Sequence, residues 1–451
     1  MINNIINEIN NYDKVLILGF GKEGRSTYNL IRKYLKDKFL YIADNNDKLL
    51  ESNMFLEEDK NVSLVLGSNY LDNLDQYNLI IKSPGVNFKE IDFNNIKDKI
   101  TSQTDLFLRF ANCKTIGITA TKGKSTTSAL TYHILSNLHD NVFLVGNIGI
   151  PIFNEINNLN SDSIVVLELG VHQLQFIKKS PNISVLLNIY PEHLDLYKSY
   201  EEYKNTKLNI FNYQQDDYYR VIGLDSEDIS NYIDNKSYVI SKDKNKINNG
   251  IFINNKDLVF NNLVINKQIE NRKLIGDHNL YNISAVLCIC DILKIDLNKV
   301  YPLIENFKPL AHRIEYIGTY NNIKFYDDSI SSIPETTISC LNTIDDIDTL
   351  IVGGLNRSID LSKLIDKIDL SNITNLICMK DTGYIIGDKI LNGNIKIFRV
   401  RNMTEAVRIS LIETEKNKSC VLSPGAASYN MYKNFEERGN DFKNNVINLS
   451  K

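Results

Sequence analysis

Residues 116–127 read Ile116-Gly-Ile-Thr-Ala-Thr-Lys-Gly-Lys-Ser-Thr-Thr127 and join an apolar run to an amphipathic one. The apolar run, residues 115–119, predicts a buried strand, and apolar residues at helical spacing predict a helix over residues 125–138. The start of such a helix attracts a polyphosphate through its backbone N–H groups and its dipole. In a P-loop, Lys124 would reach the β- and γ-phosphates, and the Ser125 hydroxyl would ligate Mg²⁺. An ordinary strand-to-helix turn is the alternative, but Gly-Lys-Ser-Thr-Thr in this setting favours a nucleotide site.

Length, charge and cysteine content narrow the class of protein. The 451 residues suggest about three domains, each able to bury its own core. A net charge of −4 gives no electrostatic footprint for nucleic acid, so no nucleic-acid partner is expected. The six cysteines form no Cys-x-x-Cys pair, which indicates neither a structural zinc site nor a disulfide framework and fits a reducing cytoplasm. Because a basic, apolar leader and a membrane-length apolar run are both missing, we expect a cytoplasmic protein without membrane insertion. We also expect a monomer.

Strand-like runs alternate with amphipathic helices over most of the chain. This alternation predicts an α/β fold with parallel sheets. We expect three domains, at residues 1–104, 105–308 and 309–451. The segment over residues 217–275 is rich in Asn, Asp and Lys, and its short alternating runs predict an antiparallel appendage.

The first unit carries a glycine fingerprint, Gly19-x-Gly21-x-x-Gly24, directly after a strand-like run. Such a turn holds a diphosphate at the start of a helix. Asp44, twenty residues after the last of these glycines, is typical of an NAD site. However, nothing else resembles a hydride-transfer site, so another nucleotide, such as a nucleotide sugar, fits equally well. Ser83-Pro84-Gly85, at the end of another strand, would add backbone donors or form a simple turn.

Three further polar residues follow or accompany the strands of the second unit. Glu168 ends an apolar strand and is a natural Mg²⁺ ligand opposite Ser125, although a strand-terminal carboxylate is usually solvated. His193 also follows a buried strand, where a lone histidine is more often structural. Because ligands collect at the carboxyl ends of parallel strands, we expect Lys124, Glu168 and His193 to converge. Lys207 lies in a helical pattern that would ordinarily be a solvated face.

Taken together, these motifs resemble those of the Mur ligases, the ATP-dependent amino-acid ligases of peptidoglycan precursor synthesis. The resemblance covers essentially the whole chain, and the best match within the family is the member that adds glutamate to UDP-N-acetylmuramoyl-L-alanine. Further motifs that carry it are Gly146-Asn-Ile-Gly149, Leu422-Ser-Pro-Gly-Ala-Ala-Ser428 and Asn434-Phe-Glu-Glu-Arg-Gly439. The resemblance implies a Rossmann-like N-terminal domain for the UDP portion and a central P-loop ATPase-type α/β domain. A Rossmann-like C-terminal domain for the amino acid would close over ATP.

The resemblance also implies a mechanism. ATP phosphorylates the substrate carboxylate to an acyl phosphate, and the glutamate amine then attacks it and expels phosphate. Lys124 and two Mg²⁺ ions would supply the positive charge that the transferring phosphoryl group needs. Ser125 and Glu168 would hold one ion, and His193 the other. Lys207 matches the lysine that the family carbamylates, which turns a cation into an anionic metal ligand.

The remaining implied residues contact the three substrates. Those implied for ATP are Thr121, Lys122, Gly123, Lys124, Ser125, Thr126, Asn279, Asn282, Arg313 and Asp328. Those implied for the UDP substrate are Gly21, Lys22, Glu23, Asp44, Ser83, Pro84, Gly85, Asn147 and His193. Those implied for glutamate are Arg357, Ser428 and, through its backbone, Phe435. Helix N-terminal capping is the ordinary alternative for Asn279 and Asn282.

Three positions depart from the family pattern. Ala120 stands where the short family loop has its first Gly, which is tolerable only with a negative φ. Ile330 and Arg357 stand where enzymes for D-glutamate carry lysines, and the planar Arg fork does not simply replace a Lys. Both changes fall in the amino-acid pocket and resemble the variant branch of the family that adds L-glutamate. The configuration of the glutamate therefore stays open.

Three other classes of protein remain as alternatives. Another ligase of the superfamily, such as a folate polyglutamating enzyme, lacks the N-terminal nucleotide-sugar unit. A catalytically silent nucleotide-binding relative would explain Ala120 and the absence of a lysine at Ile330. Such a protein would not need the catalytic residues that the chain retains, which are Lys124, Ser125, Glu168, His193 and Lys207. An NAD-dependent oxidoreductase would use the glycine fingerprint alone.

Overall fold

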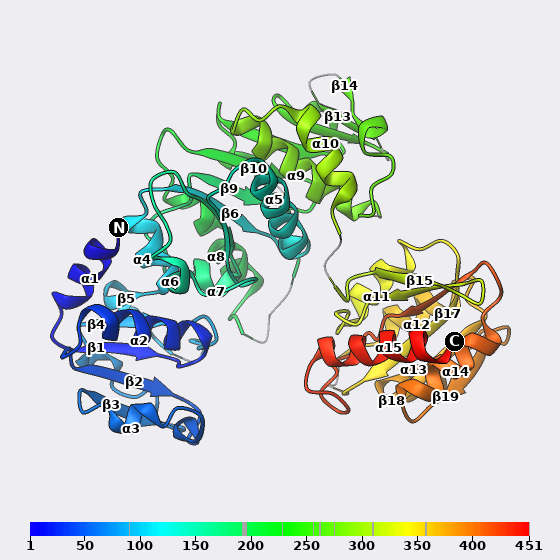
Figure 1. The fold of residues 1–451 in the computed structure, drawn as a ribbon, viewed down its shortest axis with the longest axis horizontal. Coiled ribbons are helices and arrows are strands. Elements are labelled where there is room, and N and C mark those ends of the chain that lie inside the picture. The colour runs from blue at the N-terminus through cyan, green and yellow to red at the C-terminus, as the bar shows by residue number, and fades with distance from the viewer. Residues whose placement is uncertain are drawn as a thin grey trace. The chain divides into compact units, whose positions relative to one another are not determined.

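The computed structural model describes residues 1–89, 91–191, 196–227, 229–255, 257–260, 263–274, 276–308, 311–356 and 359–450 (Figure 1). The chain forms two compact units, one of residues 1–272 with 278–307 and one of residues 273–277 with 308–451. His193 and Arg357, two of the expected site residues, lie outside the described residues.

The first sheet of the larger unit, blue in Figure 1, is parallel throughout. In spatial order its strands are β3 (Val62–Leu66), β2 (Leu40–Asp44), β1 (Val15–Leu18), β4 (Leu79–Lys82) and β5 (Ile100–Thr101). The central strand β1 is wholly apolar and buried, as expected of a parallel strand that is covered on both faces. The helices of this region are α1 (Ile2–Asn10), α2 (Lys22–Tyr34), α3 (Phe55–Glu58) and α4 (Gln103–Phe110), with 3₁₀ turns at Leu49–Ser52, Leu74–Gln76 and Lys97–Lys99.

The second sheet of the larger unit has the strand order β14-β13-β12-β11-β10-β9-β6-β8-β7. Its strands are β6 (Lys114–Thr119), β7 (Val142–Gly146), β8 (Ile164–Glu168), β9 (Ile183–Leu186), β10 (Tyr219–Gly223), β11 (Ser237–Ser241), β12 (Gly250–Asn254), β13 (Asp257–Phe260) and β14 (Leu263–Val264). Its helices are α5 (Lys124–Leu138), α6 (Ile152–Glu155), α7 (Val171–Leu174), α8 (Tyr200–Asn212), α9 (His278–Ile292) and α10 (Leu297–Asn306), with 3₁₀ turns at Ser230–Tyr232, Lys244–Lys246 and Asn266–Ile269. The strand and helix predicted around the phosphate loop are confirmed as β6 and α5.

The prediction of an antiparallel appendage over residues 217–275 is wrong for most of that segment. β10, β11 and β12 extend the central sheet in parallel, and only β13 and β14 pair antiparallel at its edge. All five residues of β11 are buried, and α9 packs on β10, β11 and β12. The helix that covers these strands, α9, comes after them in the chain. The sequence of the strands alone therefore gave no sign that they are buried in the central sheet.

The smaller unit holds the third sheet, yellow to red in Figure 1, with the order β15-β16-β20-β17-β18-β19. Its strands are β15 (Glu315–Tyr320), β16 (Ile323–Asp327), β17 (Ile347–Gly354), β18 (Asn375–Asp381), β19 (Lys396–Arg399) and β20 (Ser419–Leu422). Its helices are α11 (Pro334–Leu341), α12 (Ser362–Asp369), α13 (Thr382–Lys389), α14 (Met403–Glu413) and α15 (Phe435–Leu449). Among the described strands of this sheet, only β15 runs antiparallel to its neighbour, and apolar clusters pack on both faces of the sheet.

The α/β class predicted from the sequence is confirmed, with three sheets, each flanked by helices. The numerical limits of the three expected domains stay a prediction. Among the described helices, none combines the length and the apolar character needed to cross a membrane.

Candidate active site

The phosphate loop runs from the end of β6 to the start of α5. Gly123 precedes the helix with φ +94°, and a Cβ there would lie 2.4 Å from Oδ1 of Asn282. Only glycine therefore fits this position without strain. Ala120 is not among the described non-glycine residues with positive φ, so the condition for an alanine at this place is met. The ammonium group of Lys124 folds back onto the loop, where it donates to the carbonyl oxygens of Ala120 (2.8 Å) and Thr121 (3.1 Å).

Lys207 approaches the same loop from α8. Its side chain is buried, its Nζ donates to the carbonyl oxygen of Ala120 at 2.9 Å, and the ring centroid of Tyr203 lies 5.0 Å away. The solvated helix face that the sequence pattern alone suggested is therefore wrong. Lys124 and Lys207 converge on one carbonyl group, although 83 residues separate them in the chain.

Glu168, at the end of β8, is fully buried beside the phosphate loop. Its Oε1 accepts hydrogen bonds from the Ser125 hydroxyl (3.2 Å) and the Asn147 amide (2.7 Å). Its Oε2 is also buried and has no hydrogen-bond partner among the described residues. An unsatisfied carboxylate oxygen next to a P-loop hydroxyl fits a hard, oxygen-binding cation such as Mg²⁺. Asn147, expected at the UDP substrate, contacts this carboxylate.

Asn188 fixes the loop and was not recognised from the sequence. Its Oδ1 accepts from the backbone N–H of Lys122 (2.8 Å), and its Nδ2 donates to the carbonyl oxygen of the same residue (2.9 Å). Thr121 is held in turn by the Tyr203 hydroxyl, 3.0 Å from its Oγ1. The one available signal for Asn188 was its position close to the end of a buried strand, two residues after β9.

Asn279 and Asn282, the two asparagines implied for ATP, lie on the first turns of α9. The side-chain Oδ1 of Asn282 accepts from the Thr127 hydroxyl (3.0 Å), and its Nδ2 donates to Oδ1 of Asn279 (2.7 Å). Both asparagines are buried, and they tie α9 to the phosphate-loop helix α5, on which Thr126 is also buried.

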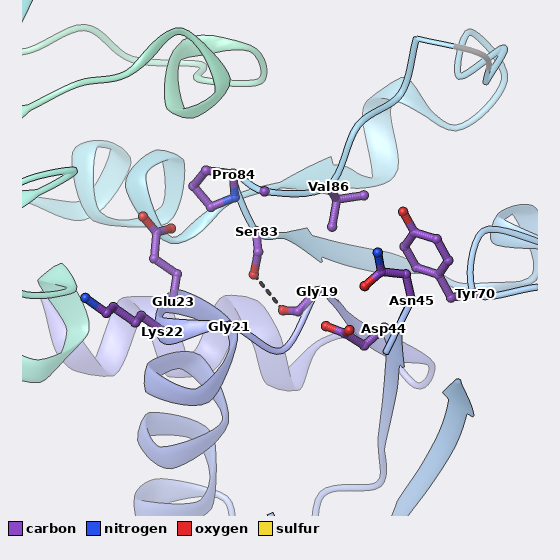
Figure 2. Close-up of a pocket in the computed structure, with 11 residues that line it drawn as sticks. Gly19, Gly21, Lys22, Glu23, Asp44, Asn45, Tyr70, Ser83, Pro84 and Val86 are labelled. Carbon is purple, nitrogen blue, oxygen red and sulfur yellow. Dashed lines mark hydrogen bonds between the residues drawn. The ribbon is translucent and has the colours of Figure 1, made fainter. Parts of the chain in front are cut away.

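The glycine fingerprint forms one wall of a second site, a cavity of about 400 Å³ (Figure 2). Seven of the residues expected at the UDP substrate line this cavity: Gly21, Lys22, Glu23, Asp44, Ser83, Pro84 and Gly85. Asn147 is the one described residue of that set that does not line it. The rest of the lining consists of Gly19, Asn45, Tyr70 and Val86. A Cβ on Gly24 would lie 2.0 Å from the carbonyl oxygen of Gly19, so this glycine allows α2 to start close to the turn. Figure 2 shows the Ser83 hydroxyl donating to that same carbonyl (2.6 Å) between Asp44 and Glu23.

In the smaller unit, Asp328 is buried directly after β16. Its Oδ2 accepts from the hydroxyls of Ser331 (2.6 Å) and Ser423 (2.7 Å). Burial raises the pKa of this carboxyl to about 6, against the lowering effect of these hydrogen bonds. Arg313 follows His312, which accepts a hydrogen bond at its carbonyl oxygen from the backbone N–H of Ile330 (3.1 Å).

Arg438 connects the segments that are expected to hold glutamate. It lies in the motif Asn434–Gly439, but the sequence analysis assigned it no role. Its guanidinium donates to the carbonyl oxygens of Ser329 (2.8 Å) and Ala426 (3.0 Å), and burial lowers its pKa to about 10. The Ser329 hydroxyl donates to the carbonyl oxygen of Phe435 (2.8 Å). Ser428 is buried two residues beyond Ala426, so three of the motif segments meet around one arginine.

A cluster of His312, Glu315 and Asp327 in the same unit has ligand-like spacing, but its side chains already have partners. The ammonium group of Lys443 lies 2.7 Å from a Glu315 oxygen and 3.9 Å from an Asp327 oxygen. Nδ1 of His312 is hydrogen-bonded to the same Asp327 oxygen at 2.6 Å. These contacts explain the cluster without a metal ion.

Comparison with known proteins agrees with this arrangement. The family model of the Mur ligase middle domain matches residues 118–290. A UDP-N-acetylmuramoylalanine–D-glutamate ligase of Clostridium botulinum (strain 657 / Type Ba4) is 35% identical over 452 residues, which cover 97% of both chains. A ligase of the same name from Clostridium tetani (strain Massachusetts / E88) is 32% identical over 448 residues and also covers 97% of both.

Solved structures show the same fold at low sequence identity. The MurF ligase from Thermotoga maritima, in complex with ADP, aligns with a TM-score of 0.61 at 15% identity over 96% of this chain and 95% of the other. The UDP-N-acetylmuramate–alanine ligase MurC from the same organism aligns with a TM-score of 0.59 at 18% identity over 97% and 100%. Because the two clostridial ligases are 35% and 32% identical to it over nearly the whole length, this chain belongs to the Mur ligase family.

Proposed function

We propose that this chain is an ATP-dependent ligase that joins glutamate to UDP-N-acetylmuramoyl-L-alanine in peptidoglycan precursor synthesis. The observation that carries the proposal is the meeting of Lys124, Glu168 and Lys207 at one phosphate loop, since this set serves phosphoryl transfer to a carboxylate. The names of the clostridial relatives support the choice of substrates. We assign residues 1–104 to the UDP portion, 105–308 to ATP and 309–451 to glutamate.

ATP binds at the phosphate loop, with Lys124 moving from the two loop carbonyls to the β- and γ-phosphates. Ser125 and Glu168 would hold Mg²⁺, and the family implies His193 and carbamylated Lys207 as further ligands. When bound, Mg²⁺ neutralises charge on the phosphates as the phosphoryl group moves to the substrate carboxylate. Asn147 keeps the Glu168 carboxylate oriented through its hydrogen bond.

The cavity beside the glycine fingerprint binds the UDP portion, with its diphosphate at the start of α2. Asp44 accepts a hydrogen bond from the backbone N–H of Phe20 (2.6 Å), which shapes the turn that receives the phosphates. Ser83, directly after the neighbouring strand β4, closes the turn through its hydrogen bond to the Gly19 carbonyl oxygen.

Glutamate binds in the smaller unit at Ser428, the backbone of Phe435 and Arg357. The relatives' names favour D-glutamate. Ile330 and Arg357 keep L-glutamate as the competing hypothesis, because both replace lysines of the D-glutamate pattern.

Phosphate release by the purified protein tests the proposal, with ATP, Mg²⁺ and UDP-N-acetylmuramoyl-L-alanine and with each glutamate enantiomer in parallel. We expect release with D-glutamate and none when either glutamate or the UDP substrate is omitted. Release with L-glutamate alone would assign the chain to the variant branch. Release with neither enantiomer, from a protein that binds ATP, would contradict the proposed reaction.

A further inference from the structure

His312 and Asp327 form a buried pair to which the proposed function gives no role. Nδ1 of His312 lies 2.6 Å from Oδ2 of Asp327, and both side chains are buried. The other carboxylate oxygen of Asp327 accepts a hydrogen bond from the backbone N–H of Ser329 at 2.9 Å. Because a carboxylate can only accept hydrogen bonds, the proton between the two side chains belongs to Nδ1. The neutral imidazole ring therefore carries its lone pair on Nε2.

Nε2 is the open nitrogen of the His312 ring. It has no hydrogen-bond partner among the described residues, and it is not one of their fully buried polar atoms without a partner, so solvent reaches it. A histidine acts as a general base when one nitrogen is held by a carboxylate and the other is free to take a proton. The pair has this arrangement.

The backbone around His312 is held in an unfavourable conformation. His312 has φ +63° and Ile314 has φ +47°, an angle that a β-branched residue rarely adopts. The N–H of His312 donates to Oε2 of Glu315 at 2.7 Å, and its carbonyl oxygen accepts from the N–H of Ile330 at 3.1 Å. The N–H of Ile314 donates to Oδ1 of Asp328 at 3.2 Å. Strain that the surroundings impose in this way gathers at functional sites, and here it fixes the position of the ring.

The pair adjoins the segment that is expected to hold glutamate. The ring centroids of His312 and Phe435 lie 6.1 Å apart, with the ring planes at 81°. Ser329, whose N–H binds Asp327, donates its hydroxyl to the carbonyl oxygen of Phe435 at 2.8 Å. One turn further along α15, a Cβ on Gly439 would lie 2.2 Å from Nδ1 of His312, so this glycine lets the helix pack directly on the ring. Only a short aliphatic chain separates the amine of glutamate from its side-chain carboxylate, so a carboxylate held at Phe435 brings the amine close to this pair.

We propose that His312 is the general base that takes a proton from the ammonium group of the incoming glutamate, with Asp327 as its positioning residue. The inference rests on the proposed function, because it takes the smaller unit as the glutamate site. An ammonium nitrogen has no lone pair and cannot attack an acyl phosphate. Its transfer of a proton to Nε2 frees the electron pair that forms the C–N bond, and Asp327 stabilises the imidazolium. The C–O bond to phosphate then breaks, the phosphate leaves with that electron pair and with the second proton from nitrogen, and the imidazolium gives its proton to water.

His312→Asn tests the base with two nucleophiles. Asparagine keeps an N–H donor near the Nδ1 position and tolerates a positive φ, but it cannot take up a proton. Phosphate release from ATP, Mg²⁺ and UDP-N-acetylmuramoyl-L-alanine is measured with saturating D-glutamate and, separately, with hydroxylamine, which is uncharged at neutral pH and needs no base. We expect the variant to lose about 100-fold or more with glutamate, the scale of general base catalysis, and to keep the wild-type rate with hydroxylamine.

The matched control is His139→Asn, which changes an exposed histidine and should leave both rates unchanged. An equal loss with both nucleophiles in His312→Asn would overturn the inference, because the ring would then act through packing or on phosphoryl transfer. A wild-type rate with glutamate in this variant would overturn it as well.

Asp327→Asn decides the matter if His312→Asn does not fold. The N–H of Ser329 needs the remaining side-chain oxygen, so the new NH₂ group faces His312 and forces the ring proton onto Nε2. The inference predicts a lower rate with glutamate and an unchanged rate with hydroxylamine, and equal changes of the two rates would overturn it. Failure of the wild-type protein to release phosphate with either nucleophile, although it binds ATP, would instead contradict the proposed function.

Discussion

Lys124 and Lys207 donate hydrogen bonds to one acceptor, the carbonyl oxygen of Ala120, at 2.8 and 2.9 Å. Two ammonium groups that share one acceptor repel each other. Lys124 has to stay cationic to bind phosphate, whereas carbamylation would turn Lys207 into an anion. In the proposed reaction, the two lysines at this shared acceptor would therefore have different roles.

Replacing Lys207 by arginine tests that difference. Arginine keeps the positive charge and cannot be carbamylated under ordinary conditions, because it does not deprotonate. We expect Lys207→Arg to lose about 100-fold or more in turnover, the scale on which a lost group that stabilises transition-state charge acts. The ¹³C carbamate signal seen with ¹³C-bicarbonate should disappear in the same variant. A fully active Lys207→Arg protein would contradict the carbamylated role.

Glu168→Gln should separate metal binding from loop structure. An amide oxygen can still accept from Ser125 and Asn147, but the buried Oε2 becomes an NH₂ group that cannot ligate a cation. We expect turnover to fall by about 10²–10³-fold and the Mg²⁺ concentration for half-maximal phosphate release to rise. Glu155→Gln, which changes a surface carboxylate of the same region, serves as the control and should leave both quantities unchanged. An unaltered Mg²⁺ dependence of Glu168→Gln would remove this carboxylate from the metal site.

Gly123→Ala should disturb the phosphate loop. The backbone φ of +94° and the 2.4 Å approach of a Cβ to Asn282 Oδ1 both oppose an alanine. We expect a loss of about 1–3 kcal/mol in the free energy of unfolding, measured by urea titration, together with weaker ATP binding. Gly393→Ala is the matched control, because a Cβ there meets nothing within 4 Å. Equal stability of the two variants would mean that the loop does not need its left-handed residue.

Asp328 gives a pH dependence of definite sign. Its pKa of about 6 in the folded protein exceeds the ordinary value of 3.8, so folding favours its protonated form. Stability from this residue is full below about pH 4 and falls as the pH rises to 6, because the unfolded chain loses the proton first. Asp328→Asn removes that fall.

The free energies of unfolding of wild type and Asp328→Asn, measured at pH 4.5 and pH 7.5, test this sign. Relative to the wild type, the free energy of unfolding of Asp328→Asn should increase by about 2 kcal/mol between pH 4.5 and pH 7.5. A difference that is independent of pH would show that the Asp328 carboxyl titrates normally.

The local parts of this fold could be predicted from the sequence. β6 and α5 lie within one residue of the expected strand and helix, because apolar periodicity and Gly123 act over a few residues. The structure of residues 217–275 could not be predicted, because the helix that buries their strands begins only at His278. Its short runs carry no local sign of which strands they pair with.

Several residues of the site were missed for the same reason. Asn188 meets Lys122 across 66 positions, and Arg438 meets Ser329 across 109. From sequence alone, a polar side chain is expected to lie in solvent, because its burial is favourable only when hydrogen-bond partners are present.

The most direct test of the account follows one oxygen atom. UDP-N-acetylmuramoyl-L-alanine with ¹⁸O in the alanine carboxylate is incubated with the protein, ATP, Mg²⁺ and D-glutamate, and the released phosphate is analysed by mass spectrometry. An acyl phosphate forms when a carboxylate oxygen attacks the γ-phosphorus, and attack by the glutamate amine then expels that oxygen with the phosphate. We predict one ¹⁸O atom in each phosphate released from labelled substrate. Unlabelled phosphate, with the amide product formed, would contradict the account.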